Sequence, residues 1–269
     1  MLNFLYNTFL GRLLLKMVCK PAISRFIGVI LDSKMSLIFV PSFVKKHKIN
    51  MSDYLADDFK SFNDFFMRKI KPGLRPFDED ENAFCSPCDG MLSVYSVSDG
   101  TVLPIKQSEY TIEDLLNNRE LSAEFKNGLC LVFRLCVNNY HRYSYFDDGI
   151  KGENIFIPGL LHTVRPLALE KFPVFVRNCR EYTVMETKHF GKCIQVEVGA
   201  LLVSKIANEH GACDFEKGSE KGHFEYGGST IIVLMKNDQV ELCEKYNHII
   251  NTCAEISVKM GEKIGAKSE

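Results

Sequence analysis

The chain changes character near residue 83, and this change constrains its fold more than any other feature. From Ala83 onward, short runs rich in β-branched and aromatic residues alternate with Gly, Asn, Asp and Pro. The runs cover 91–97, 130–137, 154–157, 181–186, 193–198 and 230–235. Such spacing is typical of an antiparallel β core, either barrel-like or a sandwich. We also expect a helix over 112–116 and a solvated acidic loop over 78–81, whereas 201–207 is compatible with strand or helix.

The first 60 residues have the opposite texture, because apolar residues dominate and Lys and Arg interrupt them. We expect an amphipathic helix over 2–20 and a second apolar stretch over 26–44, broken at 32–34 and at Pro41. Ser52 and Asp53 are suited to cap a short helix that ends at Lys60. No apolar run reaches the roughly 18 to 20 residues that a membrane-spanning helix needs. Two compatible interpretations remain: helices packed on the core, or an anchor lying in the membrane interface.

These patterns predict an α+β fold with two parts. Residues 1–60 form a helical, membrane-associating segment, and residues 61–269 form a β-rich domain. The second part opens with a helical turn that carries the aromatic cluster of 62–68. A chain of 269 residues is long enough to bury a sizeable core.

Composition excludes some partners and indicates a compartment. The net charge is −1, so no overall field favours nucleic acid. Ten cysteines without a secretory signal favour reduced thiols in the cytosol over a disulfide framework. Cys85 and Cys88 form a lone CxxC without further ligands at zinc spacing, so we predict structural thiols and no metal.

The segment Gly227-Gly228-Ser229-Thr230 joins a polar, Gly-rich loop to an apolar run. Taken alone, it is typical of a hairpin turn, because Gly-Gly-Ser tolerates positive φ. It also suits self-cleavage, in which the Ser229 hydroxyl attacks the carbonyl of Gly228. The resulting ester would undergo β-elimination, and hydrolysis would leave a pyruvoyl group at a new N-terminus. The first step needs a base for the hydroxyl and donors for the oxyanion.

Two other residues are candidate helpers for that attack. Asp89 stands in an Asp-Gly turn before one expected strand, and His141 follows another. An Asp, a His and a Ser at three strand ends are similar to the orienter, base and nucleophile of a relay. Each has an ordinary alternative, because Asp-Gly is a common turn and a single His is often only a structural hydrogen-bonding group.

Five motifs, taken in order from Phe62 to the C-terminus, resemble the phosphatidylserine decarboxylase family. They are Phe62-Asn-Asp-Phe-Phe-Met-Arg-Lys-Ile-Lys-Pro-Gly-Leu-Arg-Pro76, Ser86-Pro-Cys-Asp-Gly90, Tyr140-His-Arg142, Val198-Gly-Ala200 with Lys217-Gly and Gly222-His-Phe224, and Gly228-Ser229-Thr230. The order matters, because each motif alone has an ordinary structural explanation.

This resemblance implies a proenzyme that cleaves itself between Gly228 and Ser229, with Asp89, His141 and Ser229 as the processing relay. Residues 1–228 and 229–269 would become two chains, and Ser229 would become the pyruvoyl cofactor. That group would form a Schiff base with phosphatidylserine and release CO2 to leave phosphatidylethanolamine. His141 is also a candidate to reprotonate the α-carbon. The implied location is peripheral, on the cytoplasmic face of the cell membrane, and a homo-oligomer is compatible with the sequence.

Two positions depart from the family pattern. A second histidine commonly follows Tyr-His-Arg, but Ser144 stands there, so the relay base is either His141, which we favour, or His162. Gly227 replaces a common Leu, which we expect to loosen the loop while leaving the scissile pair intact.

Three other functions remain as alternatives. The chain could decarboxylate another serine-bearing lipid or a soluble amino acid. It could be a non-catalytic lipid-binding homologue, with Ser144 as the sign of lost chemistry. A plain serine hydrolase is disfavoured, because the sequence has no Gly-x-Ser-x-Gly elbow and Ser229 enters a strand instead of a helix.

Overall fold

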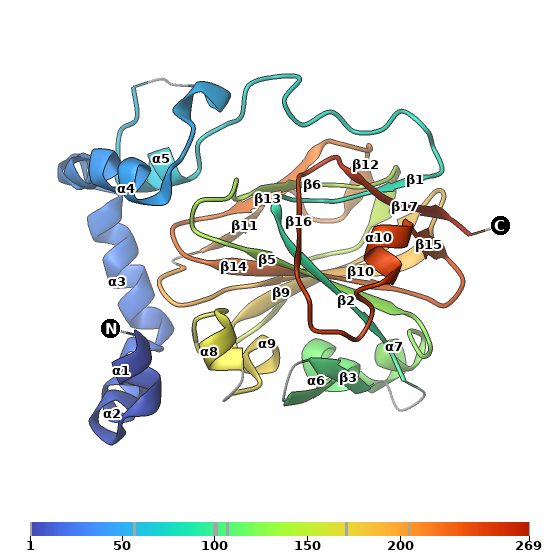
Figure 1. Ribbon diagram of the computed structural model, residues 1–269, viewed down its shortest axis with the longest axis horizontal. Coiled ribbons are helices and arrows are strands. Elements are labelled where there is room, and N and C mark those ends of the chain that lie inside the picture. Colours follow the sequence, from blue (N-terminus) through green and yellow to red (C-terminus); the bar gives the residue numbers. More distant parts are fainter. Residues whose placement is uncertain are drawn as a thin grey trace.

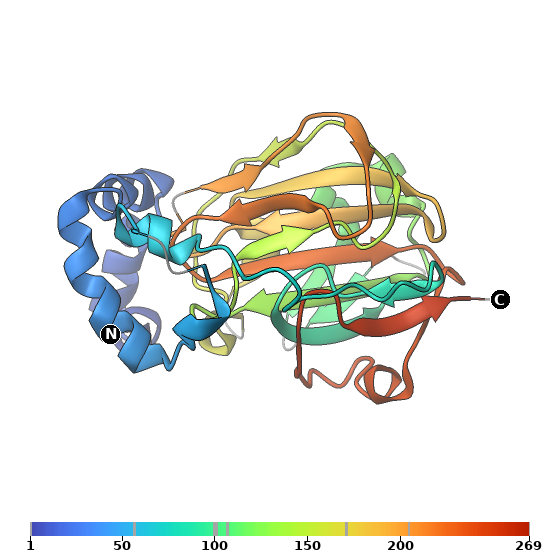
Figure 2. The same cartoon turned by 90° about the horizontal axis from the view of Figure 1, so that it is seen from above.

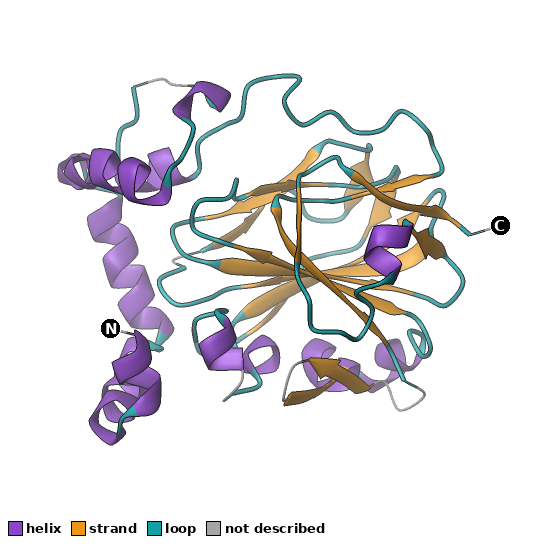
Figure 3. Cartoon of the chain, viewed as in Figure 1, coloured by secondary structure: helices purple, strands orange, loops and turns teal. Residues whose placement is uncertain are grey.

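The computed structural model describes residues 2–55, 58–98, 102–105, 108–169, 172–203 and 205–268. Helices gather at one end of a β body, and the C-terminus lies at the other end (Figures 1 and 3). The expected α+β class is therefore confirmed. The N-terminal elements are α1 (Leu2–Asn7), α2 (Phe9–Val18), α3 (Pro21–Leu31), the 3-10 helix η1 (Lys34–Phe39), α4 (Val40–His47), the 3-10 turn η2 (Met51–Asp53) and α5 (Phe62–Phe66).

The N-terminal helices differ from the expectation in three places. The helix expected over 2–20 is two helices, because the Thr8 side chain caps α2 by accepting a hydrogen bond from the Gly11 amide. The break after Leu31 is confirmed, but Pro41 lies in the first turn of α4, where proline is tolerated. The helix expected from Ser52 to Lys60 is only the turn η2, and positions 56 and 57 lie outside the described residues.

A nine-stranded antiparallel sheet forms the centre of the body. Its order is β12-β7-β9-β10-β14-β5-β2-β16, with β8 also paired to β9. The expected strands lie here within two residues at each end. The bounds of the nine strands, of which β7, β12 and β16 were not expected, are β2 (Gly90–Ser96), β5 (Leu129–Leu135), β7 (Gly149–Lys151), β8 (Ile155–Ile157), β9 (Arg180–Thr187), β10 (Gly191–Val198), β12 (Cys213–Phe215), β14 (Ser229–Met235) and β16 (Ile256–Val258).

Smaller sheets pack with this one in layers, as Figure 2 shows. One is β1 (Ala83–Cys85), β17 (Lys263–Lys267) and β15 (Val240–Leu242); another is β11 (Ile206–Asn208), β13 (Glu220–Phe224) and β6 (Arg142–Ser144). The hairpin β3 (Val102–Ile105) and β4 (Ser108–Thr111) stands apart. Of the two forms that the sequence left open, the described residues form sandwich-like sheets and no closed barrel.

Short helices complete the body. They are α6 (Ile112–Leu116), α7 (Arg119–Ala123), α8 (Pro166–Leu169), α9 (Val174–Arg177) and α10 (Glu244–Asn247). The expected helix over 112–116 is confirmed, and Thr111 caps it. Within 201–207 a strand begins only at Ile206, and position 204 is not described.

Aromatic side chains join the helices to the body. Phe43 of α4 packs edge-on against Phe62 of α5, with 5.1 Å between ring centroids, and Tyr226 lies 5.1 Å from Phe62. Because Tyr226 precedes β14, the connection that enters this strand lies at the helical end of the molecule.

Among the described helices, one pair joined at a sharp bend is long and apolar enough in total to cross a membrane. No individual helix among them has both the length and the apolar character to cross a bilayer. The stretch from α3 to α4 meets these criteria only as a pair bent by 87°.

Candidate active site

Ser229 is the first residue of β14, which lies between β10 and β5 in the large sheet. All seven residues of this strand are buried, and the Ser229 side chain has no exposed surface. Its hydroxyl has no hydrogen-bond partner among the described residues. A buried polar group without a partner costs about 1–3 kcal/mol, so such a group in a native protein suggests a function.

The two glycines before Ser229 are constrained differently. Gly227 has a φ of +142°, and a Cβ there would lie 2.6 Å from the Val203 amide nitrogen. A leucine therefore does not fit at 227, and the glycine permits close packing instead of simply loosening the loop. At Gly228 the nearest atoms to an added Cβ are 3.7 Å away. An added Cβ at Gly228 would thus make ordinary van der Waals contacts without a clash, so space does not require a glycine there.

His141 lies against the segment that leads into the scissile pair. Its carbonyl accepts a hydrogen bond from the Phe224 amide at the end of β13, and its ring packs on Phe66 with 4.3 Å between centroids. Burial and the Arg68 guanidinium lower the pKa of His141 to about 3, although the main chains of Asn139 and Gly227 oppose this shift. The ring is therefore neutral at physiological pH.

The hydrogen bonding of His141 defines which ring nitrogen carries the proton. Nδ1 lies 3.0 Å from the carbonyl oxygen of Asn139, and a carbonyl can only accept. Nδ1 must then be the donor, which leaves the lone pair of the neutral ring on Nε2. This atom is buried and forms no hydrogen bond of normal geometry with a described residue, although the main chain of Gly227 lies near the ring. An unprotonated, unpaired Nε2 is the form that a general base requires.

Asp89 is held by other groups. Both carboxylate oxygens accept hydrogen bonds from Arg75 at 2.7 Å, and Oδ1 also accepts one from the Met260 amide. Asp89 precedes β2, and β5 separates β2 from β14. Two strand spacings, roughly 10 Å, therefore lie between Asp89 and Ser229.

The three predicted relay residues are thus buried at the same end of the sheet but are not connected. No hydrogen bond within the described part of the chain joins Asp89 to His141 or His141 to Ser229. His141 lies on the Gly227 side, whereas Asp89 is committed to Arg75. Ser144, where the family commonly has histidine, lies near Asp89, because its Oγ is 3.4 Å from the Met260 sulfur and its amide donates to the Pro87 carbonyl.

His162, the alternative base, belongs to a different environment. Its Nδ1 lies 3.3 Å from the Tyr6 hydroxyl and 3.5 Å from the Cys19 sulfur, both in the N-terminal region. Its ring stacks on Phe172 at 4.8 Å. Burial, followed by the charge of Arg177, lowers the pKa of His162 to about 4. These contacts indicate that His162 fixes the N-terminal helices to the body.

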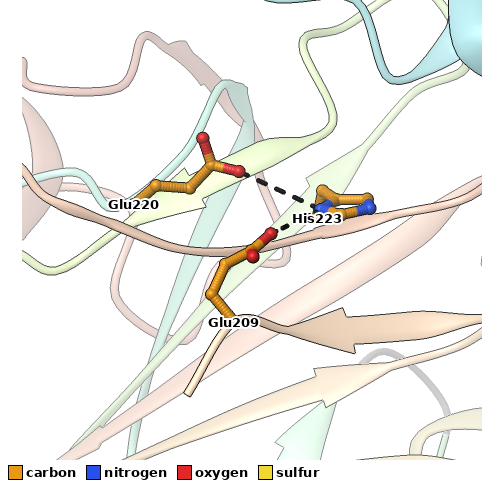
Figure 4. A group of neighbouring side chains, drawn as sticks. All are labelled: Glu209, Glu220 and His223. Carbon is orange, nitrogen blue, oxygen red and sulfur yellow. Dashed lines mark hydrogen bonds and ion pairs between the residues drawn. The ribbon is translucent and has the colours of Figure 1, made fainter.

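One cluster of potential metal ligands lies away from this site. Glu209, Glu220 and His223 converge on the small sheet that contains β11 and β13, as Figure 4 shows. Arg142 pairs with Glu220, and His223 lies 3.2 Å from Glu209, so the charges already have partners. A cavity of about 570 Å³ opens beside Glu209 and Glu220, but neither Gly228 nor Ser229 lines it.

The cysteines are all free, and Cys85 and Cys88 are buried. Burial raises the pKa of both thiols, which favours the unreactive protonated form. This agrees with the structural role predicted for them.

Several contacts that shape the site were not predicted from the sequence. Arg75 and Phe66 belong to the motif 62–76. That motif marked the segment as part of the family pattern, but it did not predict the contact of Arg75 with Asp89 or of Phe66 with His141. Met260 and Asn139 act through the main chain, and no residue-type pattern marks such a role.

Comparisons with known proteins show the family to which this chain belongs. The family described as phosphatidylserine decarboxylase matches residues 62–266. A phosphatidylserine decarboxylase proenzyme 2 from Clostridium acetobutylicum is 44% identical over 269 residues, covering 100% of this chain and 92% of the relative. Phosphatidylserine decarboxylase proenzymes from Clostridium novyi and Clostridium tetani are 39% and 36% identical, each covering 99% of this chain and 92% of the relative. The chain therefore belongs to the phosphatidylserine decarboxylase family.

Proposed function

We propose that this chain is a phosphatidylserine decarboxylase proenzyme that cleaves itself between Gly228 and Ser229. The observation that carries this proposal is the pair of unpartnered buried atoms, Ser229 Oγ directly after Gly228 and His141 Nε2 in a ring that lies near the main chain of Gly227. A hydroxyl without a partner is free to attack, and a free lone pair can take its proton.

In the first step His141 Nε2 accepts the Ser229 hydroxyl proton while Oγ bonds to the Gly228 carbonyl carbon. The peptide C–N bond then breaks, the Ser229 nitrogen takes a proton, and an ester remains. Loss of the Ser229 α-proton expels Gly228 as a carboxylic acid and leaves dehydroalanine. Water then replaces the nitrogen, which departs as ammonia, and Ser229 becomes a pyruvoyl group. The large chain would be 1–228 and the small chain 229–269.

Asp89 has a supporting role in this proposal. Its contacts with Arg75 and with Met260, which follows β16, hold the start of β2 beside β16, at the end of the sheet where Ser229 lies. Because Asp89 does not contact His141 directly, its influence on the base would be electrostatic or would need a rearrangement. The main-chain bond to Asn139 is what orients the His141 ring.

The buried position of Ser229 also suits the cofactor that it would become. When present, a pyruvoyl group supplies the electron sink that a decarboxylation needs. The apolar strand around Ser229 would exclude water, and Gly228, once released, would open space next to the new N-terminus. His141, neutral above its lowered pKa, would be available to move a proton to or from the reacting carbon.

We further propose that residues 1–60 associate peripherally with the cytoplasmic face of the cell membrane. Phe9, Met35 and Ile38 are 82%, 86% and 78% exposed. Arg12, Lys16 and Lys20 lie among such residues and suit anionic head groups. Ten free cysteines support a reducing compartment.

Intact mass of the purified protein tests the processing. The expected result is two chains, with 229–269 lighter than the unmodified peptide by the mass of one ammonia and resistant to Edman degradation. Release of CO2 from phosphatidylserine in detergent micelles then tests the reaction. A single chain of full mass, after expression that yields folded protein, would favour a non-catalytic lipid-binding homologue instead.

A further inference from the structure

Two cavities meet beside the scissile pair. The first, of about 280 Å³, is partly walled by Gly227 and Gly228. The second, of about 330 Å³, lies under α3 and α4 and is lined largely by apolar residues such as Leu31 and Phe43. His47 and Tyr226 belong to the walls of both cavities. A ligand could therefore extend from the helical layer to the bond that is cleaved.

The first cavity is positively charged where it meets the second. Of the two arginines that line it, Arg134 is paired with Glu255 through both Nε and a terminal nitrogen. Arg165 is exposed, and no described residue forms an ion pair with its side chain. The charges of Lys46 and Arg165 both act on His47, after burial, to lower its pKa. The charged groups that act on His47 are therefore both basic, and no carboxylate is among them.

The order of these compartments matches the order of groups in a serine phospholipid. The amino acid must reach the group derived from Ser229, and a phosphodiester follows it after one CH2 group. Glycerol and acyl chains follow the phosphodiester. Along the two cavities, the scissile glycines come first, then Arg165 and His47, then the apolar space under α3 and α4.

We propose that the two cavities form one substrate site, in which Arg165 and His47 bind the phosphodiester and the second cavity receives the start of an acyl chain. Arginine suits this role because its guanidinium can donate two parallel hydrogen bonds to phosphate oxygens. His47 can donate one more hydrogen bond from either ring nitrogen. The inference rests on the proposed decarboxylation of phosphatidylserine.

Kinetics of the processed enzyme in detergent micelles separate the two halves of the site. Arg165→Gln should raise KM about tenfold for both long-chain and short-chain phosphatidylserine, because it removes charge-assisted hydrogen bonds, and kcat should stay within about twofold. Arg165→Lys should recover part of this loss. The matched control is Arg119→Gln, since Arg119 is exposed on α7 and lines neither cavity.

Ser42→Trp tests the apolar half, because Ser42 lines only the second of the two cavities. It should raise KM for the long-chain substrate and leave KM for a water-soluble short-chain substrate unchanged. Glycerophosphoethanolamine, which has the phosphodiester but no acyl chain, should inhibit the wild type and the Ser42 variant but inhibit Arg165→Gln about tenfold more weakly.

Outcomes for this inference and for the proposed function are distinct. If the wild type is not cleaved or releases no CO2, the proposed function fails. If the wild type is cleaved and active but Arg165→Gln keeps a wild-type KM, the phosphodiester site is wrong. An equal rise in KM for Arg119→Gln would also overturn it, because the effect would then come from surface charge in general. Intact mass of every variant establishes that each has been processed.

Discussion

The helical layer and the β body place polar and apolar groups in opposite ways. Of the nineteen exposed large apolar side chains in the described residues, thirteen lie between Phe4 and Phe39. Most of the buried polar atoms without partners among the described residues lie instead in the body, including Ser229 Oγ and His141 Nε2, whereas Ser24 Oγ is the example in the helices of residues 1–60. Both arrangements cost stability in a water-soluble protein. The difference teaches that one region is suited to a lipid surface and the other to chemistry shielded from water.

The largest expected effect comes from removing the buried nucleophile. Ser229→Ala should abolish cleavage completely and leave one chain of 269 residues. Because the Ser229 hydroxyl has no partner, its loss should not lower the free energy of unfolding. Intact mass and urea denaturation measure both effects.

Thr230→Val is the matched control for this variant. The Thr230 hydroxyl is equally buried and unpartnered, but alternation along β14 puts it on the opposite face of the sheet. Cleavage should therefore proceed in this variant. If the Ser229→Ala protein were still cleaved, Ser229 would not be the nucleophile, and the body would lose its proposed role in chemistry shielded from water.

Sequence patterns predicted the strands better than the contacts between side chains. The run 230–235 is apolar after Thr230, and 193–198 alternates apolar residues with Gln195 and Glu197. Both runs are rich in Ile and Val, which favours strands. Arg75 and Asp89 are fourteen positions apart in sequence, and their ion pair depends on how a long loop returns to β2. The space available at Gly227 depends on Val203, which no local pattern reveals.

The base should give the next largest effect. His141→Gln should slow cleavage by about 10²- to 10⁴-fold, the usual contribution of a general base. His162→Gln should stay within a few-fold of the wild type, because its ring contacts Tyr6 and Cys19 instead of the glycines. Time courses of chain splitting after cell-free synthesis measure both rates. Fast cleavage in the His141 variant and slow cleavage in the His162 variant would reverse the assignment.

A smaller effect is expected at the helical layer. Replacing Phe9, Met35 and Ile38 together by serine should weaken binding to anionic liposomes at least about tenfold, because these side chains would lose burial in the interface. Cleavage should be unchanged, since these residues do not line the site. The control replaces two exposed apolar residues of the body, Ile150 and Phe156, by serine. Equal loss of binding in the control would mean that the helices do not form the membrane-facing surface.

The last effect concerns the stability of the body in mild acid. The pKa of His141 is lowered to about 3 and that of His162 to about 4, whereas an unfolded histidine has a pKa near 6.5. Between these values the unfolded chain binds more protons than the folded one, so stability must fall as pH drops below 6.5. Each histidine should contribute up to about 1.4 kcal/mol per pH unit to this slope. Urea denaturation of the uncleaved Ser229→Ala protein at pH 7.0, 6.0 and 5.0 measures how the free energy of unfolding depends on pH. Adding His162→Gln should reduce this dependence by the equivalent of about one bound proton. If the slope is the same with and without His162, that histidine is not buried in its neutral form, and the proposed attachment of the helices to the body loses its support.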